Sequence, residues 1–183
     1  EVTRIKSIDT INPTIITYTE QTKKSKTESG FDGRTLDLSL GLSDSRFSDQ
    51  DVFLVESSKA SFAGTGRAIT SKAYQVTSKD ETLTRLESQN VANPSKISFI
   101  QQMTVNEILN TTIRGELTGN LSATERTHWA DQDIVYVESS TKAFDTLDWN
   151  TTLRSTAFQI TRDNQEVTRI KSIDTINPTI ITY

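Results

Sequence analysis

The first 18 residues of this 183-residue chain occur a second time, unchanged, at its other end. Residues 1–18 and residues 166–183 both read EVTRIKSIDTINPTIITY. A third, diverged version, TLTRLESQNVANPSKISF, occupies residues 82–99 in the middle of the chain. A segment that returns at a regular period indicates a repeat architecture, in which each copy is one structural unit.

The stretches between these segments also match one another. The matching pairs are QDVFLVESSKASF at 50–62 with QDIVYVESSTKAF at 132–144, and SKAYQVT at 71–77 with STAFQIT at 155–161. The chain therefore divides into a first copy at residues 1–81, a second copy at 82–165 and the start of a third at 166–183. An engineered duplication of the first segment is the alternative, but it does not explain the version in the middle of the chain.

The distribution of apolar residues predicts an all-β protein. Short segments rich in Val, Ile, Thr and aromatic residues alternate with polar turns, and no segment shows a long 3.6-residue period. Residues 51–56 and 133–138 are apolar on both faces, which is typical of a strand inside a sandwich. Leu36, Leu38 and Leu40 alternate after an Asp-Gly turn and predict another strand. We expect two tandem Ig-like β-sandwich repeats of about 82 residues, arranged end to end.

Two kinds of segment mark possible boundaries between the copies. The sequences SKDE at 78–81 and RDNQ at 162–165 each lie between two strand-like runs, as hairpin turns or as linkers. The other candidates are the Asn-Pro pairs, because proline cannot donate to a β-ladder. These pairs are Asn12-Pro13, Asn93-Pro94 and Asn177-Pro178. We interpret the repeated segment as a strand pair that straddles this proline, with one half in each of two sheets.

Aligning the copies also gives a predicted core. Trp129 aligns with Phe47, so it is expected to pack in the core or at its rim. At least one of Phe53 and Leu54 is expected to be buried with them.

Composition excludes several classes of function. The chain has no cysteine, which removes disulfides, cysteine-type zinc sites and thiol nucleophiles. Its 20 Lys and Arg are scattered among 24 Asp and Glu, without the basic face that nucleic acid requires. No apolar run is long enough for a transmembrane helix, and no phosphate loop, nucleophile elbow or zinc motif is present. We therefore expect no enzyme, no cofactor, no nucleic-acid partner and no membrane insertion.

One pattern of carboxylates could bind a metal. Asp49 and Asp51 recur as Asp131 and Asp133, and closely spaced carboxylates can ligate calcium. The competing interpretation is a polar turn that enters a strand. Because the loops lack glycine-rich Asp repeats, we expect no metal here and keep these four residues as the calcium candidates.

The repeat period, the strand pattern and the missing cysteines resemble the tandem-repeat stalk region of bacterial cell-surface adhesins, which are built from Ig-like or related β-sandwich repeats. The resemblance implies an extracellular stalk at the bacterial surface that projects a binding domain for cell adhesion and biofilm formation. Its partners would be neighbouring repeats of the same chain. Two alternatives stay open: repeats that themselves bind a host glycan or protein by avidity, or a fimbrial subunit closed by an engineered donor strand at residues 166–183.

Overall fold

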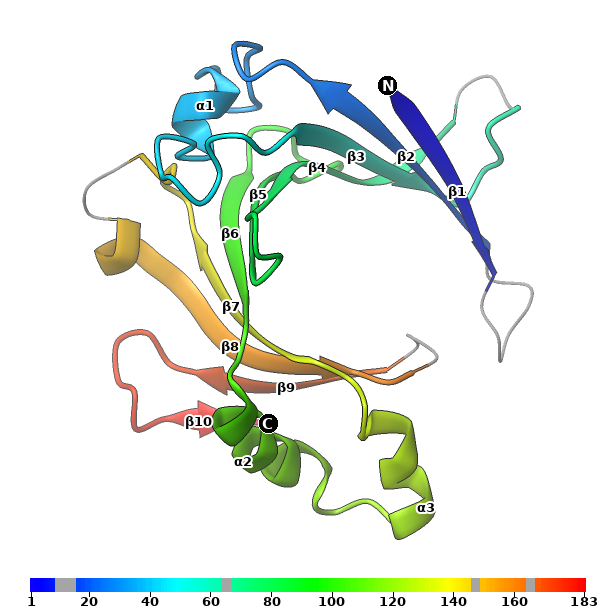
Figure 1. The fold of residues 1–183 in the computed structure, drawn as a ribbon, viewed down its shortest axis with the longest axis vertical. Coiled ribbons are helices and arrows are strands. Elements are labelled where there is room, and N and C mark those ends of the chain that lie inside the picture. Colours follow the sequence, from blue (N-terminus) through cyan, green and yellow to red (C-terminus); the bar gives the residue numbers. More distant parts are fainter. Residues whose placement is uncertain (9–15, 64–66, 146–148, 164–166) are drawn as a thin grey trace.

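The computed structural model describes residues 1–8, 16–63, 67–145, 149–163 and 167–183 (Figure 1). The described strands form one antiparallel sheet in which each strand pairs with its neighbours in sequence. The strands are β1 Val2–Ile8, β2 Ile16–Lys24, β3 Val52–Ser58, β4 Ile69–Thr77, β5 Leu83–Gln89, β6 Ile97–Thr104, β7 Ile134–Ser140, β8 Leu153–Thr161, β9 Thr168–Ile173 and β10 Ile181–Thr182. The helices are α1 Leu36–Ser39, α2 Glu107–Thr118 and α3 Ala123–Arg126, with 3₁₀ turns η1 Thr127–Trp129 and η2 Trp149–Thr152.

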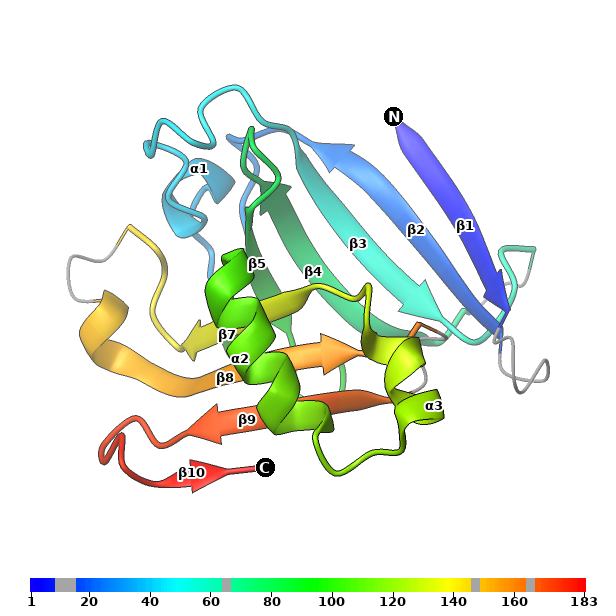
Figure 2. The ribbon, with the colours of Figure 1, turned by 60° about the horizontal axis from the view of Figure 1, so that its bottom comes forward.

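The chain is mostly β, as its sequence predicts, but the Ig-like sandwich is not confirmed. The ten described strands follow one another in a single sheet, in the order β1 to β10. Adjacent strands in a sheet rotate by about 20–25° relative to one another. Over so many strands this rotation accumulates, and Figure 2 shows β7 to β9 running across the direction of β1 to β4.

A helical segment connects the second strand to the third in each copy. In the first copy α1 lies between β2 and β3, and in the second copy α2 and α3 lie between β6 and β7 (Figure 1). Residues 36–39, predicted as part of a strand, are therefore helical. Leu36 and Leu40 are fully buried whereas Leu38 is 51% exposed. Leucines at i, i+2 and i+4 fit both patterns, and here the helical pair i and i+4 packs on the sheet.

Helix α2 lies in a part of the chain where the sequence shows no long 3.6-residue period. It begins after Asn106, whose side chain accepts a hydrogen bond of 3.0 Å from the backbone N–H of Leu109, and such a cap stabilises the first turn. Ile113 and Leu117 face the sheet and are buried. Ile108, near the start of the helix, is 84% exposed and obscures the helical period.

Both helical segments cover the same face of the sheet. Cross-strand pairing places residues of β4 to β8 in one row: Val76, Arg85, Gln101, Glu138 and Thr156. The two buried clusters use residues of this same face, with Val52 and Val76 in one and Ile134 and Ile160 in the other. We call it the helix-covered face, and the opposite side the open face.

The open face carries cross-strand pairs of hydroxyl side chains. Such pairs stabilise neighbouring strands in a sheet. The pairs are Thr19–Ser57, Thr77–Thr84, Ser139–Ser155 and Thr161–Thr168, with oxygen–oxygen distances between 2.7 and 3.1 Å.

The core prediction is confirmed at one pair of positions and wrong at another. Phe47 and Trp129 are buried, in the first and second cluster respectively. Phe53 and Leu54 are only half-buried, whereas Val52 and Ser58, at the two ends of β3, are fully buried. Phe53 lies on the open face, which explains its exposure, whereas Leu54 shares the helix-covered face with Val52 but is only partly covered.

The predicted boundaries lie at turns of the sheet. Thr77 pairs with Thr84 across the sequence SKDE, so this segment is a hairpin turn. Asn93-Pro94 lies between β5 and β6, and Asn177-Pro178 lies between β9 and β10. Asn12-Pro13 lies outside the described residues. The repeated segment is thus a strand pair around its proline in both described versions, but its two halves share one sheet. The copy limits at residues 81 and 165 stay a prediction.

Within the described residues, no helix is both long enough and apolar enough to cross a membrane.

Candidate functional site

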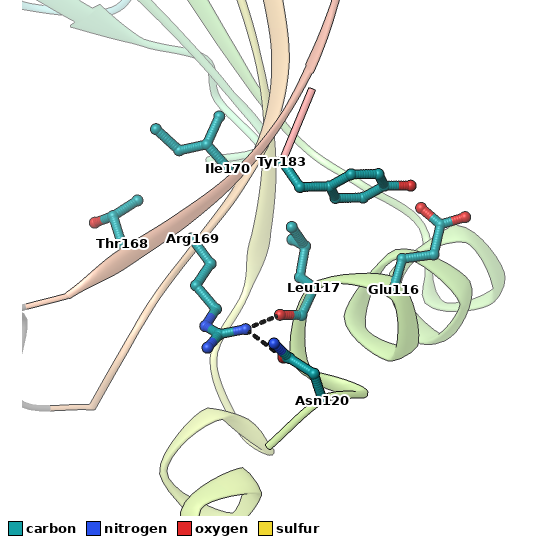
Figure 3. Close-up of a pocket in the computed structure, with 7 residues that line it drawn as sticks. All are labelled: Glu116, Leu117, Asn120, Thr168, Arg169, Ile170 and Tyr183. Carbon is teal, nitrogen blue, oxygen red and sulfur yellow. Dashed lines mark hydrogen bonds between the residues drawn. The ribbon is translucent and has the colours of Figure 1, made fainter. Parts of the chain in front are cut away.

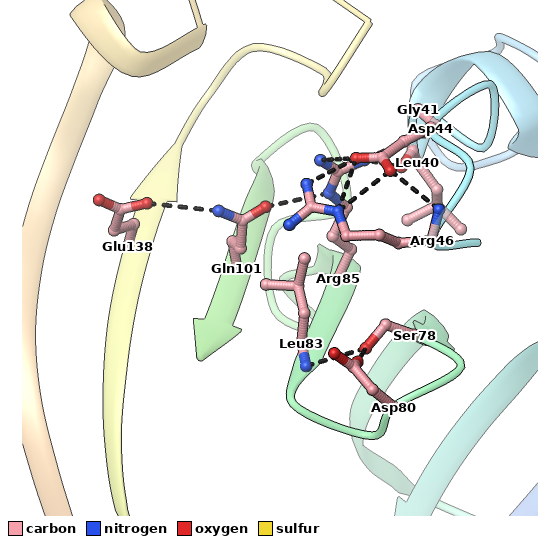
Figure 4. A network of polar contacts seen from close by, with 10 residues as sticks. All are labelled: Leu40, Gly41, Asp44, Arg46, Ser78, Asp80, Leu83, Arg85, Gln101 and Glu138. Carbon is pink, nitrogen blue, oxygen red and sulfur yellow. Dashed lines mark hydrogen bonds and ion pairs between the residues drawn. The ribbon is translucent and has the colours of Figure 1, made fainter. Parts of the chain in front are cut away.

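Arg85 is the centre of a polar network on the helix-covered face (Figure 4). Its Nη1 donates to the carbonyl oxygens of Leu40 at 3.1 Å and Gly41 at 3.0 Å. Its Nε donates to Oε1 of Gln101 at 3.0 Å, and Nη2 lies 3.5 Å from a carboxylate oxygen of Asp44. The guanidinium thus contacts the end of helix α1 on one side and strand β6 on the other.

Two aromatic rings enclose the same guanidinium. Its carbon lies 4.7 Å from the ring centroid of Phe47 and 4.8 Å from that of Phe144. Burial lowers the pKa of Arg85 to about 10, so it stays charged at neutral pH. Asp44 supplies a compensating charge, and hydrogen bonds from Arg46 lower the pKa of Asp44 to about 2.

Arg85 belongs to the second copy, whereas Leu40, Gly41, Asp44 and Phe47 all belong to the first. Phe144 and Gln101 belong to the second copy, like Arg85. The network is therefore a junction between consecutive copies, and we call it the Arg85 junction.

Arg169 occupies the matching position on β9 and binds the helical segment of the second copy (Figure 3). Its Nη1 donates to the carbonyl oxygen of Leu117 at 2.6 Å and to Oδ1 of Asn120 at 2.8 Å. Its guanidinium carbon lies 5.7 Å from the ring of Trp129. Arg169 thus repeats the contacts that Arg85 makes with the preceding copy.

Arg4 occupies the same position on β1, and its partners come from its own copy. Its Nε donates to Glu20 at 2.7 Å, as Arg85 does to Gln101. Its guanidinium carbon lies 5.2 Å from the ring of Phe62, the counterpart of Phe144. The side chain of Arg4 is 59% exposed.

The residue two positions further along each strand adds a charge to the junction. Glu87 on β5 is fully buried and accepts hydrogen bonds from Ser39 Oγ at 2.7 Å and from the backbone N–H of Asp32 at 2.8 Å. Burial raises the pKa of Glu87 despite these hydrogen bonds. Gly30 packs so closely that an added Cβ would lie 2.3 Å from a Glu87 carboxylate oxygen.

The matching residue on β9 has the opposite charge. Lys171 is buried, and its Nζ lies 2.5 Å from Oε2 of Glu116 on helix α2. On β1 the equivalent is Lys6, whose Nζ lies 6.0 Å from the ring centroid of Tyr18. A Glu-bearing strand therefore follows the first copy, and a Lys-bearing strand follows the second.

A pocket of about 650 Å³ lies beside the Arg169 contacts, where β10 ends (Figure 3). It is lined by Glu116, Leu117, Asn120, Thr168, Arg169, Ile170 and Tyr183. Strand β10 pairs only with Ser172 and Ile173 of β9. The pocket thus marks the part of the β9 edge that β10 does not cover.

The four calcium candidates do not converge in the structure. Asp49 lies 2.7 Å from Lys79, and Asp51 lies 2.9 Å from Lys23. Asp131 and Asp133 lie close enough to Arg114 to favour its charged form. No group of three or more acidic, His or Cys side chains that could hold a metal occurs in the described parts of the chain.

In the sequence, the junction arginines stand out only because they recur when the repeated segments are aligned. Arg4, Arg85 and Arg169 recur at the fourth position of each repeated segment. A charged residue that returns at the same position of a predicted strand is a usable signal, because burying a charge requires dedicated partners. The sequence does not indicate that the partners of Arg85 and Arg169 lie in the preceding copy.

No family model, curated protein or solved structure matches this chain.

Proposed function

We propose that this protein is a structural repeat module in the stalk of a bacterial cell-surface adhesin, where it holds a binding domain away from the cell. The observation that supports this most is the Arg85 junction. A largely buried side chain of one copy, 11% exposed, is hydrogen-bonded to the main chain of the copy before it. Such a connection gives a repeat array stiffness, because neighbouring units share a sheet and a core instead of a flexible linker.

The junction is suited to a stalk because it recurs. Arg85 connects the second copy to the first, and Arg169 connects residues 166–183 to the second. Each added copy thus extends the array by the same contacts. Strands in a sheet are about 4.8 Å apart, so a unit of four strands would add about 19 Å along the sheet.

Small-angle X-ray scattering of lengthened chains tests this function. Each lengthened chain carries additional blocks of residues 1–165 before the final segment. We expect the maximum dimension to rise steadily, by about 38 Å along the sheet for each block of eight strands. A maximum dimension that stays constant as blocks are added would contradict a stalk.

A matched series of variants separates the effect of the junction contacts on stiffness from the effect of chain length. It carries Arg→Ala at the Arg85 position of every block, at the Arg4 position of every block that follows another block, and at the Arg169 position of the final segment. These chains have the same number of residues but lack the guanidinium contacts between copies. We expect a broader distribution of dimensions than in the unmodified series. Identical scattering from both series would show that the junctions do not provide the stiffness.

A further inference from the structure

The environments of Arg4 and Arg169 are two complementary halves of the Arg85 junction. Arg85 contacts an aromatic ring and carbonyl groups of the preceding copy, and an aromatic ring and an amide of its own copy. Arg169 has the first set, in Trp129 and the Leu117 carbonyl. Arg4 has the second set, in Phe62 and Glu20. An arginine that made the contacts of both Arg4 and Arg169 would therefore make all the contacts of the Arg85 junction.

The two half-junctions are carried by identical strands. Residues 3–8 and residues 168–173 have the same sequence, TRIKSI. Strand β9 pairs with β8 in a register that places Arg169 opposite Ile160 and Ile170 opposite Gln159. A β1 strand from a second molecule would meet β8 with the same side chains in the same register.

Charge at the junction also fits this partner. Glu116 on α2 binds Lys171, and the equivalent residue of β1 is Lys6. The C-terminal half-junction therefore accepts a Lys-bearing strand, which the N-terminus of a second molecule provides. The Glu-bearing strand β5 would place Glu87 against Glu116 instead, and like charges in a buried site repel.

The N-terminal hairpin is also the longer of the two. Strand β1 pairs with β2 through seven residue pairs, whereas β9 pairs with β10 through two. In the described part of the chain, β1 is the outermost strand of the sheet, and its edge away from β2 pairs with no described strand. A free edge is a template for pairing with another chain. β2 would also bring Glu20 next to Arg4 and run along the edge where the 650 Å³ pocket lies.

We propose that molecules of this chain associate head to tail by strand exchange, in which the β1–β2 hairpin of one molecule replaces β9 and β10 of another. The exchanged hairpin pairs with β8, and Arg4 then reaches the Leu117 carbonyl and the Trp129 ring of the second molecule. Each molecule keeps a free hairpin at one end and a free acceptor at the other. Such a heterologous interface does not close on itself and produces open chains of molecules.

A reversible disulfide lock tests the exchange in the full-length chain. The unmodified chain contains no cysteine, so Gln159→Cys together with Ile170→Cys introduces one defined pair. These residues are opposite each other on β8 and β9, and the disulfide would hold β9 in place. Light scattering after size exclusion should show concentration-dependent oligomers for the unmodified chain, monomers for the oxidised lock and oligomers again after reduction.

Cross-linking between two single variants tests the register. Gln159→Cys in one preparation is mixed with Ile5→Cys in another and oxidised. The proposed register places these residues opposite each other, so a disulfide-linked heterodimer is expected. The matched control replaces Ile5→Cys by Thr19→Cys. Thr19 is opposite Ile5 on β2, one strand further from β8, and should give no specific product.

A charge-matched pair of substitutions tests the arginine itself. Arg4→Ala removes an exposed side chain and should lower association by about tenfold, since it loses a cation–π contact and hydrogen bonds. Lys96→Ala removes one positive charge at an exposed turn away from both ends and should leave association unchanged. Far-UV circular dichroism of each monomer establishes that the variants are folded.

Each outcome decides the proposal. A chain that stays monomeric at every accessible concentration would overturn it. Oligomers that persist in the oxidised lock would show that another surface mediates association. Equal cross-linking through Thr19→Cys and Ile5→Cys would reject the register. The scattering series is measured on lengthened chains at concentrations at which they are monomeric, so the stalk function and strand exchange can fail separately.

Discussion

The guanidinium carbon of Arg85 lies 4.7 Å from the ring centroid of Phe47, a residue 38 positions earlier in the chain and in the preceding copy. This contact joins a strand of one copy to the helical segment of another. Its geometry makes Arg85 a structural residue whose loss affects both copies at once.

Arg85→Ala should therefore reduce the free energy of unfolding by about 2–4 kcal/mol, because it leaves buried carbonyl groups without donors. Urea denaturation monitored by tryptophan fluorescence measures the effect. Arg126→Ala is the control, since Arg126 is exposed and surface substitutions usually change stability by less than about 0.5 kcal/mol. Similar losses in the two variants would show that the junction contributes nothing specific to stability.

Leu36 and Leu38 provide a test of the helix at residues 36–39. Leu36→Ala should cost about 2–5 kcal/mol, as expected for a fully buried leucine. Leu38→Ala should cost less than about 1 kcal/mol, because Leu38 is exposed on the helix. Chemical denaturation of both variants checks this. Equal costs would favour the alternating strand that the sequence predicts.

Glu87 should make stability depend on pH. Burial raises its pKa above the ordinary value of 4.5, so the folded chain holds this proton more tightly than the unfolded chain. The stabilisation is complete below about pH 4.5 and is lost as the pH rises through the raised pKa. Glu87→Gln has no such proton, and its stability relative to the unmodified chain should increase from pH 4 to pH 7.

Urea denaturation of both proteins at the two pH values measures this difference. Glu107→Gln serves as the surface control, because Glu107 is exposed at the start of α2. If the stability difference caused by Glu87→Gln were the same at pH 4 and pH 7, burial would not be shifting this carboxyl.

Calcium should have no effect on stability. Asp49 and Asp51 are paired with Lys79 and Lys23, and a metal would have to displace these lysines. A ligand that binds only the folded state raises the melting temperature. We expect equal melting temperatures in calcium and in EDTA. A calcium-dependent rise that disappears in the Asp49→Asn, Asp51→Asn double variant would establish a site there.

The sequence predicts the local features of this fold well. Short apolar runs predict the strands around residues 51–56 and 133–138, and the polar segment SKDE is a hairpin turn. The sequence does not predict that the strands form one continuous sheet in place of two sandwiches. The reason is that an apolar strand needs a cover on its buried face, and that cover can be a second sheet or a helical segment. The pattern within the strand is the same for both.

The junctions show more directly what the sequence of the repeated segment cannot predict. Arg4 and Arg169 lie in identical sequences, yet Arg4 is mostly exposed and Arg169 binds the Leu117 carbonyl. No pattern within the repeated segment distinguishes them, because the partners of Arg169 lie outside that segment, at Leu117 and Trp129. A prediction of these sites requires the pairing of segments that are distant along the chain.

The alternation of Glu87 and Lys171 has a consequence for the inheritance of such arrays. Repeats with nearly identical coding sequences gain and lose units by misaligned recombination. Losing the second copy would place a lysine at the Glu87 position, where it cannot accept the hydrogen bonds that the Ser39 hydroxyl and the N–H of Asp32 donate to Glu87. Leaving such buried donors without an acceptor is destabilising. Arrays of this kind would therefore change length in steps of two copies, with the order of the two types preserved.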